Sequence, residues 1–482
     1  MTSSKITALE SDRREPLDVL LNPRSVALIG ASTNPEALGG RPLGFMASYR
    51  YAGAIYPVNV NSDIVQGLKA YRSITDVPYP VDLAIVAVRA ELVPGVLREC
   101  ADAGVQMAVV MSSGFGEGMG SGAELLTEIK RGLDLTPMRV LGPNCEGLAS
   151  LPAGAPMTFS PVLDIRRTGS VLKRGGIAVV SQSGGLGFAV AGWGSEVGLG
   201  YSYILTTGNE LDIDCLELAA YFVDDPETDT LALVIESLSD MSKFAQIADL
   251  FRDAGKHLVA VKLGRSEAGA RAALAHTSHD AGDVELYDRL FAAHGVRQAH
   301  DMDELIDVLQ AITKAPALGG TRVGIVTTSG GAAVWLADAC VDQGFTVSAL
   351  SARTIERLKT HMPSYGSPTN PVDLTAQFLA GGSFVAPMRD LVESGEIDLL
   401  ILATSLSSSG RLTADREGLA QLVADSPVPI AIYTYTRPAA SCVEILNEIN
   451  VPWYTSSTRA ARGLAALMTK ESASLNEGAD RG

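Results

Sequence analysis

One stretch of the chain sets a histidine among small residues, and its composition suits a phosphoryl carrier. An apolar run over His257–Leu263 predicts a buried parallel strand, and a segment rich in glycine and alanine then leads to His276. Glycines let the backbone of such a loop approach a ligand closely, and a neutral imidazole nitrogen is a nucleophile used in covalent catalysis. His276 is therefore a candidate for a transient phosphoryl bond. The alternatives are an ordinary loop histidine and the nearby His279.

A carboxylate ends the strand that precedes this stretch. The apolar run Leu231–Ile235 predicts a strand that finishes at Glu236. A carboxylate in this position can hold an imidazole in one tautomer and orient it for proton or group transfer. An exposed acid at a strand end is the plainer interpretation.

Three glycine-rich turns each join a short apolar strand to a helical stretch. They follow the runs 24–30, 176–181 and 322–327. A turn of this kind offers backbone N–H groups and a positive helix N-terminus, which suit an anion such as phosphate. The first turn lacks the G-x-G-x-x-G spacing, so the case for a nicotinamide dinucleotide is weak.

The elements that must position these turns alternate between strand and helix along the whole chain. The first unit has further predicted strands at 54–60, 82–88, 108–111 and 138–141, with a helix over 42–51. The second adds a strand at 201–206 and helices near 284–294 and 301–315, and the third adds strands near 346–349, 398–403 and 428–433. This alternation predicts an α/β fold of three consecutive doubly wound parallel-sheet domains.

Loop-like segments separate the three units. Residues 150–175 and 315–320 are rich in proline and glycine and read as linkers, and 370–374 reads as a polar turn. Polar groups follow several strand ends of the first unit, among them Asn59, Ser112, Ser113 and Asn144. Open α/β sheets bind ligands at that edge, although ordinary loop punctuation is the alternative for any single residue.

Composition limits the class of protein and of partner. At 482 residues the chain has room for about three domains of roughly 150 residues each. A net charge of −17 argues against a nucleic-acid partner. The cysteines show no metal-binding or disulfide spacing, which fits a reducing cytoplasm. Neither a signal peptide nor an apolar run of about 18 residues is visible, so no membrane association is expected.

Taken in order, these motifs resemble the α subunit of NDP-forming acyl-CoA synthetases, the ADP-forming acetyl-CoA synthetases of the succinyl-CoA synthetase superfamily. The resemblance covers roughly residues 17–465. Its carriers are SVALIGAS (25–32), IYPVN (55–59), SSGFGE (112–117), GPNCEG (142–147), VSQSGGLG (180–187), TTGNELDID (206–214), DPETDTLALVIES (225–237), KLGRSEAGARAALAHTSHDAG (262–282), TTSGGAAV (327–334) and NPVDL (370–374).

The resemblance implies a domain plan. Residues 1–16 would be a disordered lead-in and 470–482 a flexible tail. Between them would lie a CoA-binding Rossmann-like domain (17–150), a succinyl-CoA-synthetase-like domain with the phosphohistidine loop (170–314) and a flavodoxin-like ligase-CoA domain (320–469).

It also implies roles for individual residues, with no metal held by this chain. His276 would take the phosphoryl group, with Glu236 as its paired carboxylate. The residues implied to hold phosphate are Ser181, Ser183, Gly184, Gly185, Thr328, Ser329, Gly330 and Gly331. The residues implied to hold CoA are Gly30, Ser32, Thr33, Gly40, Arg41, Asn59, Val88, Ser112, Ser113 and Asn144.

The histidine loop departs from the family pattern. The family reads Ser-His-Thr-Gly-Ala-Leu-Ala-Gly where this chain has Ala275-His276-Thr277-Ser278-His279-Asp280-Ala281-Gly282. The change puts the mobility of the loop and the substrate preference in question, but not the histidine itself. The acid, the choice between ADP and GDP and the net direction stay open.

The chain shows no ATP-grasp domain. The resemblance therefore implies a separate ATP-grasp β subunit that holds Mg²⁺ with ATP/ADP or GTP/GDP, in an α–β hetero-oligomer acting on a small carboxylic acid and CoA. Two other functions stay open: a non-catalytic CoA-binding or regulatory protein of the same fold, and an NAD-dependent oxidoreductase.

Overall fold

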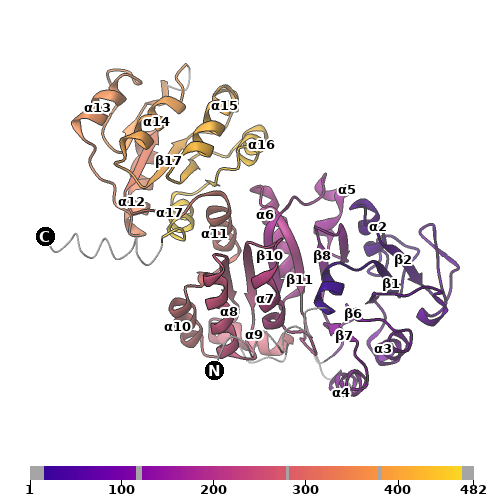
Figure 1. The fold of residues 1–482 in the computed structure, drawn as a ribbon. Coiled ribbons are helices and arrows are strands. Elements are labelled where there is room, and N and C mark those ends of the chain that lie inside the picture. The colour runs from indigo at the N-terminus through magenta and orange to yellow at the C-terminus, as the bar shows by residue number, and fades with distance from the viewer. Residues whose placement is uncertain (1–15, 116–121, 278–281, 378–380, 469–482) are drawn as a thin grey trace. The chain divides into compact units, whose positions relative to one another are not determined.

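The computed structural model describes residues 16–115, 122–277, 282–377 and 381–468, without the side chains of 274–277. The chain divides into two compact units, residues 1–195 with 200–300 and residues 196–199 with 301–482. Figure 1 shows strands and helices alternating through both units. Three large sheets carry the fold, and the predicted α/β class is confirmed. The predicted lead-in and tail fall almost entirely outside the described residues.

The first sheet has five parallel strands in the order β2-β1-β5-β6-β7. Each is short and nearly all apolar, as expected for strands covered on both faces. The strands are β1 Ser25–Ile29, β2 Ala54–Val58, β5 Leu83–Val86, β6 Met107–Val110 and β7 Arg139–Leu141. Helices α2 Arg41–Ser48, α3 Val93–Asp102 and α4 Gly122–Leu133 connect them, with a small hairpin of β3 Ile64–Val65 and β4 Leu68–Lys69 after β2.

The second sheet has seven strands in the order β14-β13-β12-β10-β11-β8-β9. The strands are β8 Gly147–Ser150, β9 Ala155–Thr158, β10 Arg174–Ser181, β11 Tyr201–Thr206, β12 Thr230–Ile235, β13 His257–Lys262 and β14 Arg297–Ala299. The helices are α5 Ile165–Thr168, α6 Gly184–Glu196, α7 Cys215–Asp224, α8 Met241–Asp253, α9 Glu267–Thr277 and α10 Val284–His294. Five of the strands, β10 to β14, run parallel to one another.

The prediction of a linker over 150–175 is wrong in part. Strands β8 and β9 form an antiparallel hairpin, and β8 pairs antiparallel with β11 at the edge of the second sheet. The Pro152 and Gly154 signal belongs to the turn of this hairpin, where Gly154 has a φ of 60°. The second sheet therefore begins directly after the last turn of the first.

The prediction of a loop around His276 is also corrected. Residues Glu267–Thr277 form helix α9, so His276 stands near the end of a helix. The alanines of this segment explain the difference, because alanine has the highest helix propensity and outweighs the lone Gly269.

The third sheet has five parallel strands in the order β16-β15-β17-β18-β19. These are β15 Val323–Thr327, β16 Val372–Asp373, β17 Leu399–Thr404, β18 Ile430–Thr434 and β19 Trp453–Tyr454. The helices of this unit are α11 Met302–Lys314, α12 Gly330–Asp342, α13 Ala352–Lys359, α14 Val385–Ser394, α15 Gly410–Asp425, α16 Ala440–Glu448 and α17 Ser457–Ala465.

The predicted strand at 346–349 is absent from this sheet, since only Thr346 makes a bridge, to Arg322. The side chain of Asn370 takes the place of that strand. Its amide donates to the carbonyls of Val323 and Ser348, and its oxygen accepts from the N–H of Ile325. The edge of β15 is thus occupied, and the turn predicted at 370–374 supplies β16.

No helix within the described ranges is long and apolar enough to cross a bilayer.

Candidate functional site

The residues predicted to bind CoA gather along one edge of the first sheet. Gly30 follows β1, Asn59 follows β2, Val88 follows β5, Ser112 follows β6 and Asn144 follows β7. Because these strands are parallel, all five positions open on the carboxyl edge, where such sheets bind ligands. The loops after β1 and β6 contribute the others, Ser32, Thr33, Gly40, Arg41 and Ser113.

The chain leaves β1 in very close contact with the end of β5. A side chain at Gly30 would bring its Cβ within 2.4 Å of the carbonyl oxygen of Ala87, and the φ of Gly30 is +85°. Only glycine fits both conditions. The turn therefore lies flat against the neighbouring strand end. Its first N–H groups are bonded within the fold, those of Gly30 and Ala31 to the carbonyl of Val58 and that of Ser32 to the carbonyl of Gly39.

Two of the predicted CoA residues fix the loops through their side chains. Asn59 donates from Nδ2 to the carbonyl of Ala31 at 2.7 Å and accepts from the N–H groups of Asn61 and Ser62. Ser112 Oγ donates to the carbonyl of Val88 at 2.6 Å. These two side chains therefore hold the loops of this edge in place.

Gln66 is a residue of this edge that the sequence reasoning missed. It sits in the turn of the β3–β4 hairpin with a φ of 47°, and its Nε2 donates to the carbonyls of Ser32 and Gly40, both at 3.0 Å. One amide thus ties both ends of the first glycine-rich loop. The Gln66-Gly67 pair, which stands between Ile64–Val65 and Leu68–Lys69, is a turn signal that could have pointed to the hairpin.

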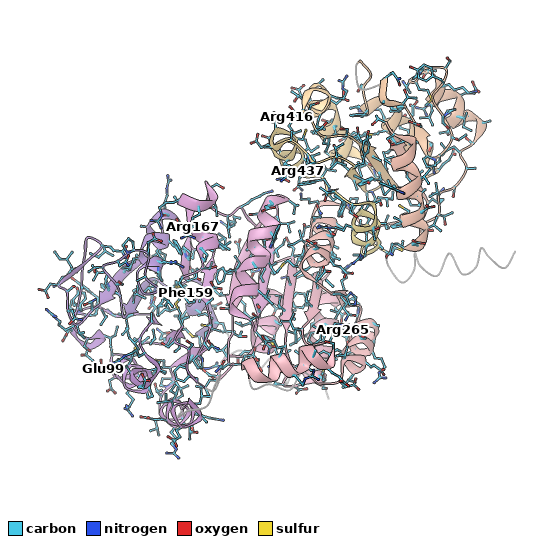
Figure 2. All side chains as sticks on the ribbon, turned by 180° about the vertical axis from the view of Figure 1, so that it is seen from behind. Glu99, Phe159, Arg167, Arg265, Arg416 and Arg437 are labelled. Atoms are coloured by element: carbon cyan, nitrogen blue, oxygen red, sulfur yellow. The ribbon has the colours of Figure 1, made fainter. Side chains whose placement is uncertain are left out.

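Arg41, predicted to meet CoA phosphates, already donates to two carbonyls. Its Nε reaches Glu36 and its Nη1 reaches Phe159, each at 3.1 Å. Phe159, labelled in Figure 2, follows the strand β9 of the second sheet. Arg41 therefore links the two sheets, and only the remaining N–H groups of its guanidinium are available to a phosphate.

A single side chain organises the carboxyl edge of the second sheet. Gln182 is 5% exposed, and its Oε1 accepts from the N–H groups of Glu236 at 2.6 Å and Ser237 at 3.0 Å. Its Nε2 donates to the carbonyl of Ser237 and to Glu210 Oε2, both at 2.8 Å. The backbone of Glu236 is thus locked to the turn between β10 and α6.

Glu210 sets the orientation of that amide. Its Oε1 accepts from Thr207 Oγ1 at 2.8 Å and from the N–H of Cys215 at 2.9 Å. Burial raises the pKa of the Glu210 carboxyl, and the hydrogen bonds from Thr207 and Gln182 oppose that rise. A carboxylate only accepts hydrogen bonds, so it requires the NH₂ end of Gln182 and directs the oxygen of Gln182 to Glu236.

The N-terminus of α6 faces open space beside this network. Ser181 is fully buried and its Oγ donates to the carbonyl of Ser183, so Ser181 supports the turn from behind. A Cβ on Gly185 would meet no atom within 4 Å. Ser183, Gly184 and Gly185 are therefore the predicted phosphate residues that a ligand can reach, and the free N–H groups of a helix start suit an anion.

The segment that carries His276 leaves the sheet directly beside Glu236. Ile235 and Lys262 are paired in the parallel ladder, and the N–H of Leu263 donates to the carbonyl of Ile235 at 2.8 Å. The side chain of His276, and His279 as a whole, lie outside what the structure describes. Sheet register therefore brings the start of this segment to Glu236, which is itself 6% exposed.

An ion pair anchors the start of the same segment. Arg265, labelled in Figure 2, forms two parallel hydrogen bonds of 2.8 Å to the carboxylate of Asp288 on α10. Gln298 Nε2 adds a third at 2.7 Å. The Arg265 guanidinium lowers the pKa of Asp288 to about 2, with a further contribution from Gln298. The path from β13 to α9 is thus held at a fixed point.

The third predicted anion turn lies in the other compact unit. Thr328 is buried, and its Oγ1 lies 3.2 Å from both Thr404 Oγ1 and Tyr435 Oη. Ser329 caps helix α12, whereas Gly330 and Gly331 are exposed, and a Cβ on Gly331 would meet nothing within 4 Å. As in α6, the hydroxyl at the strand end supports the turn, since Thr327 Oγ1 donates to the carbonyl of Ser329 at 3.0 Å, and the glycines present an open helix start.

The two edges of the first unit meet at the turn after β7. Asn144 Nδ2 donates to Asn209 Oδ1 at 3.2 Å, and the N–H of Asn209 donates to the carbonyl of Pro143 at 2.9 Å. Glu146 follows immediately and touches the start of α6, since a Cβ on Gly184 would lie 3.3 Å from Glu146 Cβ. The predicted CoA residue Asn144 and the predicted phosphate turn before α6 are therefore neighbours, as a transfer between a thioester and phosphate requires.

Comparison with known proteins shows the family to which the chain belongs. Subunit alpha of the ADP-forming acetate–CoA ligase I from Pyrococcus furiosus is 34% identical over 466 residues, which cover 94% of this chain and 97% of that protein. The chain belongs to the family of ADP-forming acetate–CoA ligase α subunits. Subunit alpha of the ADP-forming acetate–CoA ligase II from Pyrococcus furiosus is 33% identical over 461 residues, which cover 94% of this chain and 97% of that protein.

Domain models and a solved structure agree with the family. The models match a CoA binding domain at 24–150, a succinyl-CoA ligase like flavodoxin domain at 174–312 and a ligase-CoA domain at 323–406. The dinucleotide forming acetyl-coenzyme A synthetase 1 of Ca. Korarchaeum cryptofilum, solved with phosphate and ADP, is 31% identical with a TM-score of 0.82, over 94% of this chain and 96% of that one. The expected resemblance and enzyme class, an NDP-forming acid–thiol ligase that uses CoA, are confirmed.

Proposed function

We propose that this chain is the α subunit of an enzyme that interconverts a carboxylate, CoA and a nucleoside triphosphate with acyl-CoA, the diphosphate and phosphate. The observation that carries the proposal is the meeting of three features at one edge. Glu236, the open N-terminus of α6 and the strand that leads to His276 are brought together there by Gln182 and the β12–β13 register. The domain division 17–150, 170–314 and 320–469 belongs to the same proposal.

The chemistry runs through two intermediates. In the direction of triphosphate synthesis, a phosphate oxygen attacks the thioester carbonyl, the C–S bond breaks, and acyl phosphate and the CoA thiol form. An imidazole nitrogen of His276 then attacks the phosphorus, and the bond to the acyl oxygen breaks, releasing the carboxylate. Glu236 orients the ring and balances its positive charge. The N–H groups around Gly184 and Gly185 stabilise the phosphoryl oxygens.

The second half of the reaction needs a nucleotide site. We assign it to an ATP-grasp β subunit that holds Mg²⁺ with ADP or GDP in a cytoplasmic α–β complex, where the diphosphate takes the phosphoryl group from His276. The relatives that match over their full length are subunits alpha, which supports a separate partner. Acetate, the acid in the names of those relatives, is the first acid to test.

Labelling tests the proposal. The α–β complex is incubated with Mg²⁺ and ATP labelled in its γ-phosphate, using wild type, His276→Ala and His279→Ala chains. We expect acid-labile, base-stable label on wild type and on His279→Ala, and none on His276→Ala. Label that survives in His276→Ala would contradict the role of that residue. No label on wild type, with CoA still bound, would favour a CoA-binding protein without the chemistry.

A further inference from the structure

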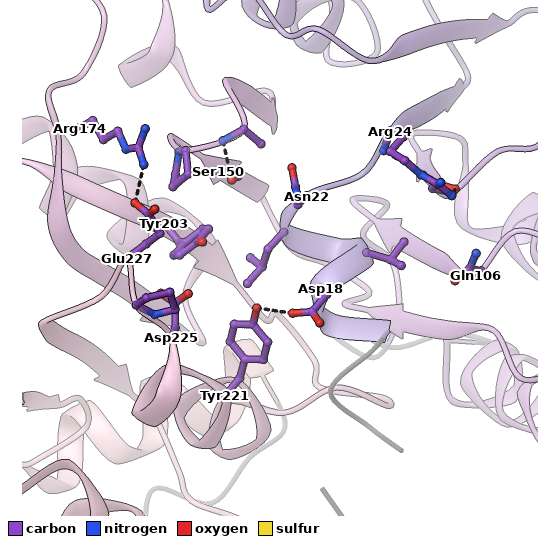
Figure 3. Close-up of a pocket in the computed structure, with 16 residues that line it drawn as sticks. Asp18, Asn22, Arg24, Gln106, Ser150, Arg174, Tyr203, Tyr221, Asp225 and Glu227 are labelled. Atoms are coloured by element: carbon purple, nitrogen blue, oxygen red, sulfur yellow. Dashed lines mark hydrogen bonds and ion pairs between the residues drawn. The ribbon is translucent and has the colours of Figure 1, made fainter. Parts of the chain in front are cut away.

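A polar cavity of about 780 Å³ opens at the amino-terminal edge of the two sheets of the first unit (Figure 3). Asp82 lines it and directly precedes β5, whose other end leads to Val88. Arg174 lines it at the start of β10, whose other end is Ser181. The cavity therefore lies at the opposite ends of the strands that carry the proposed CoA and phosphate positions, and the proposed reaction leaves it unused.

One hydroxyl group opens into this cavity without a hydrogen-bond partner among the described residues. Tyr203, on β11, is 6% exposed and lines the cavity, and its ring packs on Phe222 with centroids 5.4 Å apart. Among the residues that the structure describes, none forms a hydrogen bond with the hydroxyl of Tyr203. The residue is buried almost completely, and its hydroxyl is left free to bond to a ligand in the cavity.

The charges around this phenol are mainly negative. Asp225 is 4% exposed and accepts from Thr228 Oγ1 at 2.6 Å, and Asp18 accepts from Tyr221 Oη at 2.6 Å. Together with Glu227 they lie close enough to Tyr203 to act on it, and after burial they raise the pKa of its phenol. The phenol is therefore neutral, and its oxygen can accept a hydrogen bond.

The arginines of the cavity are already paired. Arg24 forms two hydrogen bonds to Asp82, and Arg174 lies 2.6 Å from Glu227. The lining thus has four carboxylates and two guanidinium groups, so two carboxylates are in excess, and it also holds the rings of Tyr203 and Tyr221. The charged side chains of the lining therefore sum to −2, which favours a cation over an anion. Aromatic faces are also a feature that proteins use to bind ammonium groups.

We propose that this cavity is a second binding site, for a small organic polycation, with one ammonium group seated between Tyr203 and Asp225 and another toward Asp18. A volume near 780 Å³ is in the range of small-molecule sites. An ammonium group donates up to three hydrogen bonds, which the Tyr203 oxygen and the neighbouring carboxylates would accept. The site does not depend on the proposed transfer of phosphate.

The test is calorimetric titration of the full chain with spermidine at about 0.15 M salt, which screens general attraction to an acidic surface. The decisive variant is Tyr203→Phe, because it removes one hydroxyl and leaves every charge in place. Asp225→Asn is the second variant and keeps an oxygen for Thr228. The matched controls are Tyr79→Phe and Asp134→Asn, at exposed positions away from the cavity.

We expect saturable binding that weakens at least tenfold in Tyr203→Phe and in Asp225→Asn, while both controls bind as wild type does. Glutarate and glycerol should give no saturable heat. The absence of saturable spermidine binding would overturn the proposal. So would binding that both cavity variants leave unchanged, since the cation would then sit elsewhere on the acidic surface.

Discussion

Gln182 Oε1 accepts the N–H of Glu236 at 2.6 Å, and this bond ties the proposed catalytic residue to the turn before α6. The two residues are far apart in the chain, yet the position of the proposed catalytic carboxylate depends on the amide. Glu210 fixes the amide from its other end.

Replacing Gln182 by Met keeps the length of the side chain but removes its four hydrogen bonds. We expect the rate of phosphoryl labelling at His276 to fall by 10- to 100-fold, because small displacements of a catalytic group are costly. The free energy of unfolding should fall by about 1–3 kcal/mol through unpaired buried groups. CoA affinity should be unchanged. Rapid-quench labelling and CoA titration measure the two effects.

Gln66→Met is the matched control for Gln182→Met, because it should affect CoA binding and not the labelling of His276. It releases the first glycine-rich loop at Ser32 and Gly40, so we expect KM for CoA to rise severalfold while the labelling rate at His276 stays near that of wild type. Steady-state kinetics of the complex provide both numbers. Equal effects of the Gln66 and Gln182 variants on both steps would show that the carboxyl edges of the first and second sheets do not act independently.

The Asp288–Arg265 pair predicts an acid dependence of stability. The pKa of Asp288 is lowered to about 2 in the fold, so its contribution is complete above the unfolded value near 4 and is lost as the pH falls toward 2. Because Asp288 is 40% exposed in its side chain, the contribution should be about 1 kcal/mol or less. Urea unfolding at pH 6, 4 and 2.5 should show wild type and Asp288→Asn converging. A constant difference would disprove the assignment.

Replacing Glu146 by Gln should raise the stability of the fold at high pH, whereas replacing Asp288 by Asn should lower it. Burial raises the pKa of Glu146, although Ser160 and Arg41 oppose the rise, and its Oε2 is buried with no hydrogen-bond partner in the described structure. The charged form therefore destabilises the fold at high pH and has no such effect once protonated. We expect the amide to stabilise by about 1 kcal/mol at pH 8 and by little at pH 4, as measured by thermal unfolding. The exposed Glu91→Gln should show neither change.

The sheets were predictable because their strands are continuous apolar runs bounded by glycine. Tyr201–Thr206 and the helix Val284–His294 have the predicted bounds. The hairpin at 147–158 was not predictable by the same rule, since its small residues resemble a linker until β11 is present to pair with them.

Some residues of the candidate site could likewise be predicted from the sequence, and others could not. Positions after strand ends, such as Ser112 and Glu236, follow from strand prediction alone. Gln182 and Glu210 do not, because each acts through a residue that only the folded sheet brings near. Tyr203 was hidden for a similar reason, since its neighbours Asp18 and Asp225 come from distant elements.

The antiparallel hairpin has a mechanical consequence. The first sheet ends at Leu141 and the second starts at Gly147, with Asn144 bonded across to Asn209 and Arg41 bonded to Phe159. The two sheets of the first unit are therefore held to each other by hydrogen bonds at two places. In the proposed mechanism, movement of the phosphoryl group would therefore come from the chain between the Arg265 anchor and His276, and not from a hinge between the two sheets.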